Sequence, residues 1–165
     1  MRLDQFNAAP AADLRPPLLA CCDVPAWADT VLEARPYDDL DALVATADKA
    51  ARVFDRADVD RALAQHPRIG ERAAGQDTGS RWSRQEQSGV DAEAKQALLE
   101  GNRAYEDRFG RVFLVCATGL SAEQILTNLR SRLDNDDAEE AAVVADELRK
   151  IALLRLRKLV DGAPE

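Results

Sequence analysis

Histidine and cysteine are scarce in this chain. Its 165 residues include one histidine and three cysteines. Cys21 and Cys22 are adjacent, Cys116 is remote, and no CxxC spacing occurs, so no zinc site of ordinary ligand spacing can be assembled. Any imidazole chemistry must therefore take place at His66, and we expect no metal cofactor.

Long apolar runs are also absent from the sequence. Residues 1–5 lack the apolar stretch of a signal peptide, and no later run could span a bilayer. Acidic side chains outnumber basic ones by 30 to 22, for a net charge of −8, which disfavours generic binding to nucleic-acid phosphates or anionic membranes. We expect a reduced, cytoplasmic setting with neither nucleic acid nor membrane as a partner. A local basic pocket for a small anion is compatible with this total.

The remaining composition is that of a globular protein. Apolar residues make up 46% of the chain and charged residues 32%, and neither a repeat nor a low-complexity linker divides it. A chain of this length can bury a sizeable core without disulfides or a structural metal. The sequence therefore predicts a single domain over residues 1–165.

Apolar residues recur at helical spacing along most of the chain. Five prolines up to position 36 predict only brief helices in that part. We expect helices over 39–54, from an N-cap at Asp58 to near His66, over 94–109 with a stop at Gly110, over 121–133 from a capping box at Ser121, and over 138–160. The acidic stretch 134–140 is most simply a solvated helix start.

The run 111–117 is the one strand-like segment in the sequence. It is short and solitary, so we expect a buried connector or the start of a helix rather than part of a sheet. The polar stretch 67–83 contains three glycines and almost no core residues, which is typical of a functional or disordered loop. The pattern predicts an all-α, single-domain helical bundle with a long polar active-site loop.

Two residues flank that polar loop and could act together. His66 lies where Pro67 forces the chain out of a helix, and it is either a general acid or base or a helix-terminal histidine bonded to nearby carbonyls. Glu86 follows Ser83 at capping-box spacing, so it is a helix cap, a catalytic carboxylate, or both.

Arg155 is unexpected on the last helix, where it falls near the middle of an apolar stripe. A core-facing arginine is costly unless an anion or several acceptors meet its guanidinium. It is either a structural ion-pair partner or a fork that holds a ligand carboxylate or carbonyl. Trp27, Trp82 and the three cysteines are expected to serve packing.

Four motifs occur in an order and spacing that resemble one family. They are His66-Pro67-Arg68-Ile69-Gly70, Ser83-x-x-Glu86-Gln87, Phe109-Gly110 with Phe113, and Leu154-Arg155-Leu156, and Trp27 and Arg35-Pro36-Tyr37 add an N-terminal pattern. Together they resemble OHCU decarboxylases, which decarboxylate 2-oxo-4-hydroxy-4-carboxy-5-ureidoimidazoline in urate breakdown. The resemblance covers nearly the whole chain.

The resemblance implies an all-helical homodimer that needs no metal or organic cofactor. It implies a carboxy-lyase of purine catabolism that yields (S)-allantoin and carbon dioxide. His66 and Glu86 would be the catalytic pair, and the substrate would be bound by Pro67, Ser83, Gln87, Phe113 and Arg155. The alternative is a non-catalytic helical interaction module in which His66, Glu86 and Arg155 form a structural polar cluster.

Overall fold

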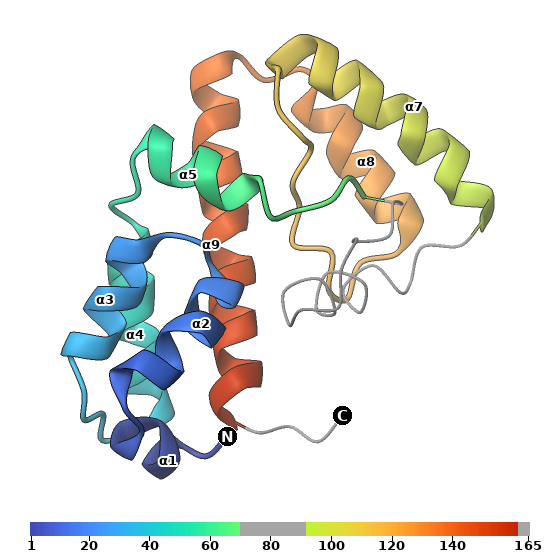
Figure 1. The fold of residues 1–165 in the computed structure, drawn as a ribbon. Coiled ribbons are helices and arrows are strands. Elements are labelled where there is room, and N and C mark those ends of the chain that lie inside the picture. The colour runs from blue at the N-terminus through green and yellow to red at the C-terminus, as the bar shows by residue number, and fades with distance from the viewer. Residues whose placement is uncertain (70–91, 162–165) are drawn as a thin grey trace. The chain divides into compact units, whose positions relative to one another are not determined.

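A computed structural model describes residues 1–69 and 92–161, and this part of the chain contains eight α-helices and no strand (Figure 1). The expected all-α class is therefore confirmed. The helices are α1 (Leu3–Ala8), α2 (Ala11–Cys21), α3 (Pro25–Glu33), α4 (Leu40–Ala51), α5 (Arg56–Leu63), α7 (Ala92–Phe109), α8 (Ala122–Arg132) and α9 (Asp137–Asp161).

The chain forms two compact units. The first unit is Met1–Ala62 with Leu148–Glu165, and the second unit is Leu63–Glu147. Helix α9 thus contributes its first turns to the second unit and its later turns to the first. The expectation of one domain over residues 1–165 stays a prediction, and the expected polar loop lies almost wholly outside the described residues.

The first unit is built around short helices, as the prolines predict. Trp27 on α3 is 1% exposed, and its indole N–H donates to the Ala47 carbonyl of α4 at 3.0 Å. Its expected packing role is confirmed. The Arg35 guanidinium donates to the carbonyls of Phe6 and Ala9 at 2.9 and 2.7 Å, which ties the chain after α3 to the end of α1. Buried side chains and a few directed hydrogen bonds hold these short helices together.

The prolines at positions 16 and 17 do not break the chain as expected, because both lie inside α2. Each proline deprives the carbonyl four residues earlier of its helical donor. Those carbonyls belong to Ala12 and Asp13, which are exposed, so water can replace the missing donors. Burial of Leu14 and Leu18 on the opposite side then holds the helix.

The helix before His66 begins earlier than expected. Helix α5 starts at Arg56, and Asp58 lies in its first turn rather than at its N-cap. Asp55 and Asp58 exchange hydrogen bonds between backbone N–H and carboxylate at 2.8 and 3.2 Å. Two aspartates three residues apart each fit the capping pattern, and Asp55 is the one that occupies the cap.

The second unit pairs α7 with α8, which lie side by side (Figure 1). A Cβ on Gly101 of α7 would lie 3.1 Å from both methyl groups of Leu129 on α8, so glycine permits this close approach. Helix α7 ends at Phe109, where Gly110 adopts a φ of 68°, a left-handed conformation that side chains disfavour. The expected stop at Gly110 is confirmed.

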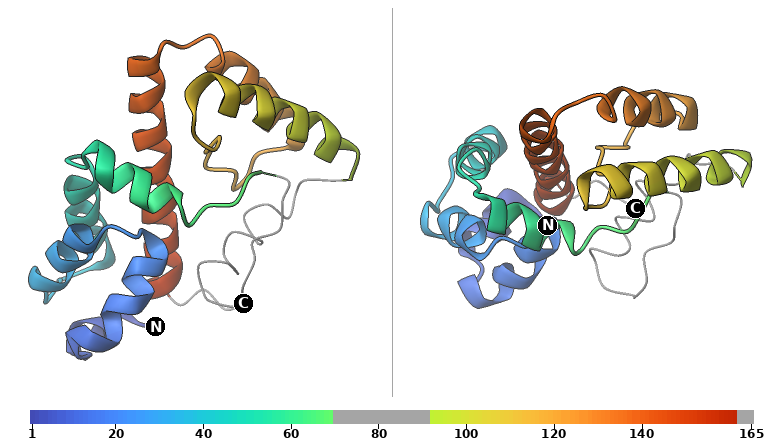
Figure 2. Two further views of the ribbon diagram at one scale, coloured as in Figure 1. Left: turned by 45° about the horizontal axis from the view of Figure 1, so that its top comes forward. Right: turned by 90° about the horizontal axis from the view of Figure 1, so that it is seen from above.

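Figure 2 shows the segment between α7 and α8 as a connector without helix or strand. Residues 113–115 and 117 are buried, so the segment is a buried connector, one of the two forms expected for the strand-like run. Phe113, Val115 and Ala117 belong to one core cluster with Leu98, Tyr105 and Ile69. Every second residue from 113 to 117 faces this cluster, which indicates an extended backbone. Helix α8 begins with the expected capping box, in which Ser121 and Gln124 exchange hydrogen bonds at 2.9 and 3.1 Å.

Cys21 and Cys22 are buried, as expected for small apolar side chains, whereas Cys116 is half-buried. Burial raises the pKa of the Cys22 thiol from its ordinary value of 9.0 to about 12, against a smaller lowering effect of Arg155. The folded protein therefore keeps this proton at pH values where the unfolded chain releases it.

We expect the free energy of unfolding to fall as the pH rises from about 9 towards 12. The stabilising contribution of the neutral thiol is complete below the unfolded pKa and disappears as the pH passes the folded pKa. Denaturant titrations of wild type and Cys22→Ala across this range would measure it. The decline should be shallower in Cys22→Ala, and equal slopes would contradict the assignment to Cys22.

Candidate functional site

Of the described residues of the predicted site, the second unit contains His66, Pro67 and Phe113. His66 and Pro67 follow α5 and are half-buried, and Phe113 is 1% exposed on the connector. Ser83, Glu86 and Gln87 lie outside the described residues. Arg155 belongs to the first unit, so its part in a shared site with His66 stays a prediction.

Helix α7 holds the chain immediately after His66. The Asn102 amide is 1% exposed and donates to the Ile69 carbonyl at 2.9 Å. One turn further on, the Glu106 carboxylate accepts two hydrogen bonds from the Arg68 guanidinium, at 2.5 and 3.0 Å. Because positions 102 and 106 share one face of the helix, α7 fixes the exit path that begins at His66.

The same core cluster contains Ile69 and Phe113. The segment after His66 and the connector therefore pack into one hydrophobic core, although they are about forty residues apart in sequence. This is the one association among the predicted site segments that the described residues establish. The sequence pattern had indicated both segments separately but not their common packing.

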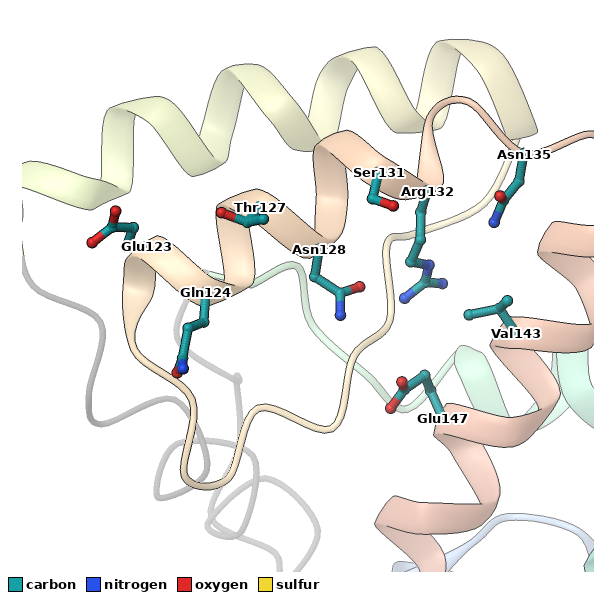
Figure 3. A pocket seen from close by; sticks show the side chains of 9 residues that line it. All are labelled: Glu123, Gln124, Thr127, Asn128, Ser131, Arg132, Asn135, Val143 and Glu147. Carbon is teal, nitrogen blue, oxygen red and sulfur yellow. The ribbon is translucent and has the colours of Figure 1, made fainter.

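Two side chains bind the connector backbone along one edge (Figure 3). Arg132 of α8 donates from Nη1 to the Leu114 carbonyl, and the Glu147 carboxylate of α9 accepts the Cys116 N–H at 3.0 Å. In an extended segment, the backbone groups of residues 114 and 116 point to the same edge, and those of 113 and 115 point to the other. Within residues 1–69 and 92–161, no hydrogen bond pairs the backbone groups of Phe113 or Val115.

Arg132 is also the centre of a buried polar cluster that the sequence analysis did not identify. Its Nε and Nη2 donate to one Glu140 oxygen at 2.8 and 2.5 Å, and the Tyr105 hydroxyl donates to the same oxygen at 2.5 Å. The guanidinium carbon lies 4.7 Å from the centroid of the Phe113 ring. Burial, followed by the bond to Glu140, raises the pKa of Tyr105.

The expectation that residues 134–140 form a solvated helix start is wrong at its last position. Glu140 is 1% exposed. It precedes Val144 and Leu148 at intervals of four residues, so it begins the apolar stripe of α9. That spacing is the signal that could have identified a buried carboxylate in the sequence.

A cavity of about 600 Å³ lies between α8 and the first turns of α9 (Figure 3). Arg132 and Glu147 line it, together with Glu123, Gln124, Thr127, Asn128, Ser131, Asn135 and Val143. Among the described residues of the predicted site, namely His66, Pro67, Phe113 and Arg155, none lines this cavity. Figure 3 shows that Glu123 points away from the connector, whereas Arg132 and Glu147 point towards it.

Arg155 is buried in the first unit, as its place on the apolar stripe predicts, with 1% exposure. Its Nη1 donates to the Ala20 carbonyl at 3.2 Å. Arg157, two residues further along α9, is instead exposed and lies 3.2 Å from the Asp41 carboxylate. The two arginines therefore differ in burial although they are close in sequence.

Residues 1–69 and 92–161 contain neither a metal-binding group of side chains nor a membrane-spanning helix. No group of three His, Cys, Asp or Glu side chains is placed to hold a metal ion there. No helix in that part combines the length and apolarity needed to cross a membrane.

The described residues thus define an all-α protein. In it, the segment after the single histidine packs into one core with a buried connector. The family model for OHCU decarboxylase matches residues 7–157. The chain belongs to the OHCU decarboxylase family.

Individual relatives agree with this assignment. The chain is 30% identical over 145 residues to the uric acid degradation bifunctional protein TTL of Arabidopsis thaliana, with 84% of this chain and 45% of that protein covered. It is 39% identical over 59 residues to the 2-oxo-4-hydroxy-4-carboxy-5-ureidoimidazoline decarboxylase of Amia calva, covering 36% of this chain and 34% of that one. The matched residues cover less than half of each of these curated relatives.

A solved structure gives the same result for the fold. The crystal structure of an OHCU decarboxylase in the presence of (S)-allantoin superimposes with a TM-score of 0.70 and 28% identity. The match covers 87% of this chain and 96% of that one. The likeness thus extends through most of the described helices.

Proposed function

We propose that this chain decarboxylates 2-oxo-4-hydroxy-4-carboxy-5-ureidoimidazoline to (S)-allantoin and carbon dioxide, without a metal or organic cofactor. The match to the family over residues 7–157 carries the proposal. The name of the Amia calva relative, and the allantoin in the solved structure, support this choice of substrate and product.

The substrate itself supplies the electron sink that decarboxylation needs. Loss of carbon dioxide leaves an electron pair on carbon, and the adjacent carbon–nitrogen double bond can accept it. The protein then has to orient the ring, manage the proton of the substrate hydroxyl and deliver a proton to one face. Holding the reacting groups in place can contribute about 7–11 kcal/mol.

His66 is the residue assigned to the hydroxyl proton. It lies at the exit of α5, and α7 holds the chain two and three residues further on through Arg68 and Ile69, which supports this choice. Glu86 orients the imidazole and assists proton transfer in this proposal. Pro67 and Ser83 line the substrate pocket in this proposal.

The backbone groups of the connector suit a flat ring with amide-like groups. Phe113 and Val115 have backbone donors and acceptors that no described residue pairs. These groups are complementary to the alternating N–H and C=O groups of such a ring. Arg155 and Gln87 hold the ureido and ring carbonyl groups. A guanidinium presents several donors in a fixed fork, which suits such acceptors.

The same proposal includes assembly and location. A homodimer in the cytoplasm is what the family resemblance implies. Sedimentation or light scattering of the purified chain would give its mass in solution.

Conversion of freshly generated substrate to optically active allantoin, followed by circular dichroism, tests the proposed reaction. Binding is tested separately by the rise in melting temperature that allantoin produces. Arg155→Ala is expected to weaken allantoin binding by about 10- to 100-fold, because hydrogen bonds to a charged group are worth about 1.5–3 kcal/mol.

Arg157→Ala is the matched control, since Arg157 lies on the same helix but is exposed. It should keep the wild-type response to allantoin. An undiminished response in Arg155→Ala would contradict the binding role of that arginine. A wild-type protein that neither binds allantoin nor releases carbon dioxide would instead favour the structural interaction module.

A further inference from the structure

We propose that Arg132 and Glu147 are positioning residues for substrate binding, and that they act by clamping one edge of the connector backbone. The proposal rests on the proposed function, because it assigns the opposite edge of the connector to the substrate. Neither residue touches the substrate in this proposal.

The first observation is the chemistry of the two contacts. An extended segment in a core needs partners for its buried backbone groups. Here a donor side chain meets the Leu114 carbonyl and an acceptor side chain meets the Cys116 N–H. Side chains from two helices thus replace the neighbouring strand of a sheet.

The second observation is the burial of both side chains. Arg132 is 4% exposed and Glu147 is 9% exposed. Burying charged groups is costly unless they are paired and hydrogen-bonded. Arg132 is anchored by Glu140 through two donors, so its third contact, with Leu114, is made by a group that is already fixed.

The third observation is the geometry of the extended backbone. Fixing the groups of residues 114 and 116 on one edge sets the direction of those of 113 and 115 on the other. The side chains of Phe113 and Val115 are locked in the core cluster, so the connector cannot rotate to compensate. The clamp therefore determines which way the free backbone donors and acceptors point.

A pair of variants isolates the acceptor of Glu147. Glu147→Met keeps a similar volume but has no strong acceptor for the Cys116 N–H, whereas Glu147→Gln keeps an amide oxygen that can accept it. We expect Glu147→Met to raise KM about tenfold with little change in kcat, as loss of a hydrogen bond that acts on bound substrate and transition state alike would do. Glu147→Gln should have a KM close to the wild-type value.

Arg132→Lys tests the other point of the clamp. An ammonium can face Glu140 but lacks the planar fork that also reaches the Leu114 carbonyl. We expect the same rise in KM from this variant, which also keeps the proposal testable if Glu147→Met does not fold. Glu123→Gln is the control, because Glu123 lines the same cavity but points away from the connector (Figure 3).

Amide hydrogen exchange gives a readout that does not depend on turnover. The Cys116 amide should exchange at least about tenfold faster in Glu147→Met than in wild type or Glu123→Gln, because its hydrogen bond is lost. Unchanged exchange in a folded variant would overturn the clamp. Faster exchange with a wild-type KM would overturn its role in binding, whereas absence of turnover in the wild-type protein would contradict the proposed function instead.

Discussion

A His66→Ala protein is expected to decarboxylate the ureidoimidazoline about 10²–10⁴-fold more slowly than wild type, because a positioned general acid or base contributes a factor of that size. His66 is the one histidine in the chain, so no other imidazole can replace it. The measurement is kcat with freshly generated substrate, with allantoin formation followed by circular dichroism.

The fold should survive this substitution. His66 is half-buried and lies after the last turn of α5, where its backbone N–H donates to the Leu63 carbonyl at 2.9 Å. Alanine keeps that backbone bond. Gln65→Ala, at the exposed neighbouring position, is the control and should keep wild-type turnover. A folded His66→Ala protein with near wild-type kcat would show that the imidazole is not catalytic.

Arg132→Met is expected to lower the free energy of unfolding by about 3–5 kcal/mol, the usual effect of removing one partner of a buried ion pair. The substitution leaves Glu140 at 1% exposure with the hydroxyl of Tyr105 and the amide of Asn135 as its remaining donors. It also removes the contacts of the guanidinium with the Phe113 ring and with Leu114. Urea titration would measure the loss.

An exposed ion pair provides the comparison. Arg56 and Asp60 lie one turn apart on α5, 3.7 Å from each other, with side chains 85% and 55% exposed. Asp60→Asn should change stability by at most about 0.5 kcal/mol, since solvent screens such pairs. Equal effects at the two sites would contradict the structural importance given to Arg132.

Regular helices were the most predictable part of the fold. Leu43, Ala47 and Ala51 are buried on α4 at intervals of four residues, and the cap at Asp39 accepts the Ala42 N–H at 2.7 Å. Periodicity and caps are local properties, so one sequence is enough to find them. The prolines of α2 were not predictable in this way, because the burial of the helix depends on distant residues.

The candidate site was predictable only in part. His66 could be singled out because the chain has no second histidine, and Phe113 came from the family resemblance. Glu147 and Asn102 could not be singled out in this way. Each is one polar residue within an apolar stripe, and each binds a backbone group far away in sequence. Side-chain bonds to a distant backbone leave no pattern in residue spacing.

No strand among residues 1–69 and 92–161 pairs with the connector, and this has a consequence for the protein without a ligand. An open backbone edge is a template on which other extended chains can pair. Here that edge is short, since Ala117 already uses its carbonyl to accept the Leu120 N–H at 3.0 Å. The short run of unpaired backbone groups therefore matches the small cyclic amide of the proposed function better than a peptide, and its shortness also limits self-association.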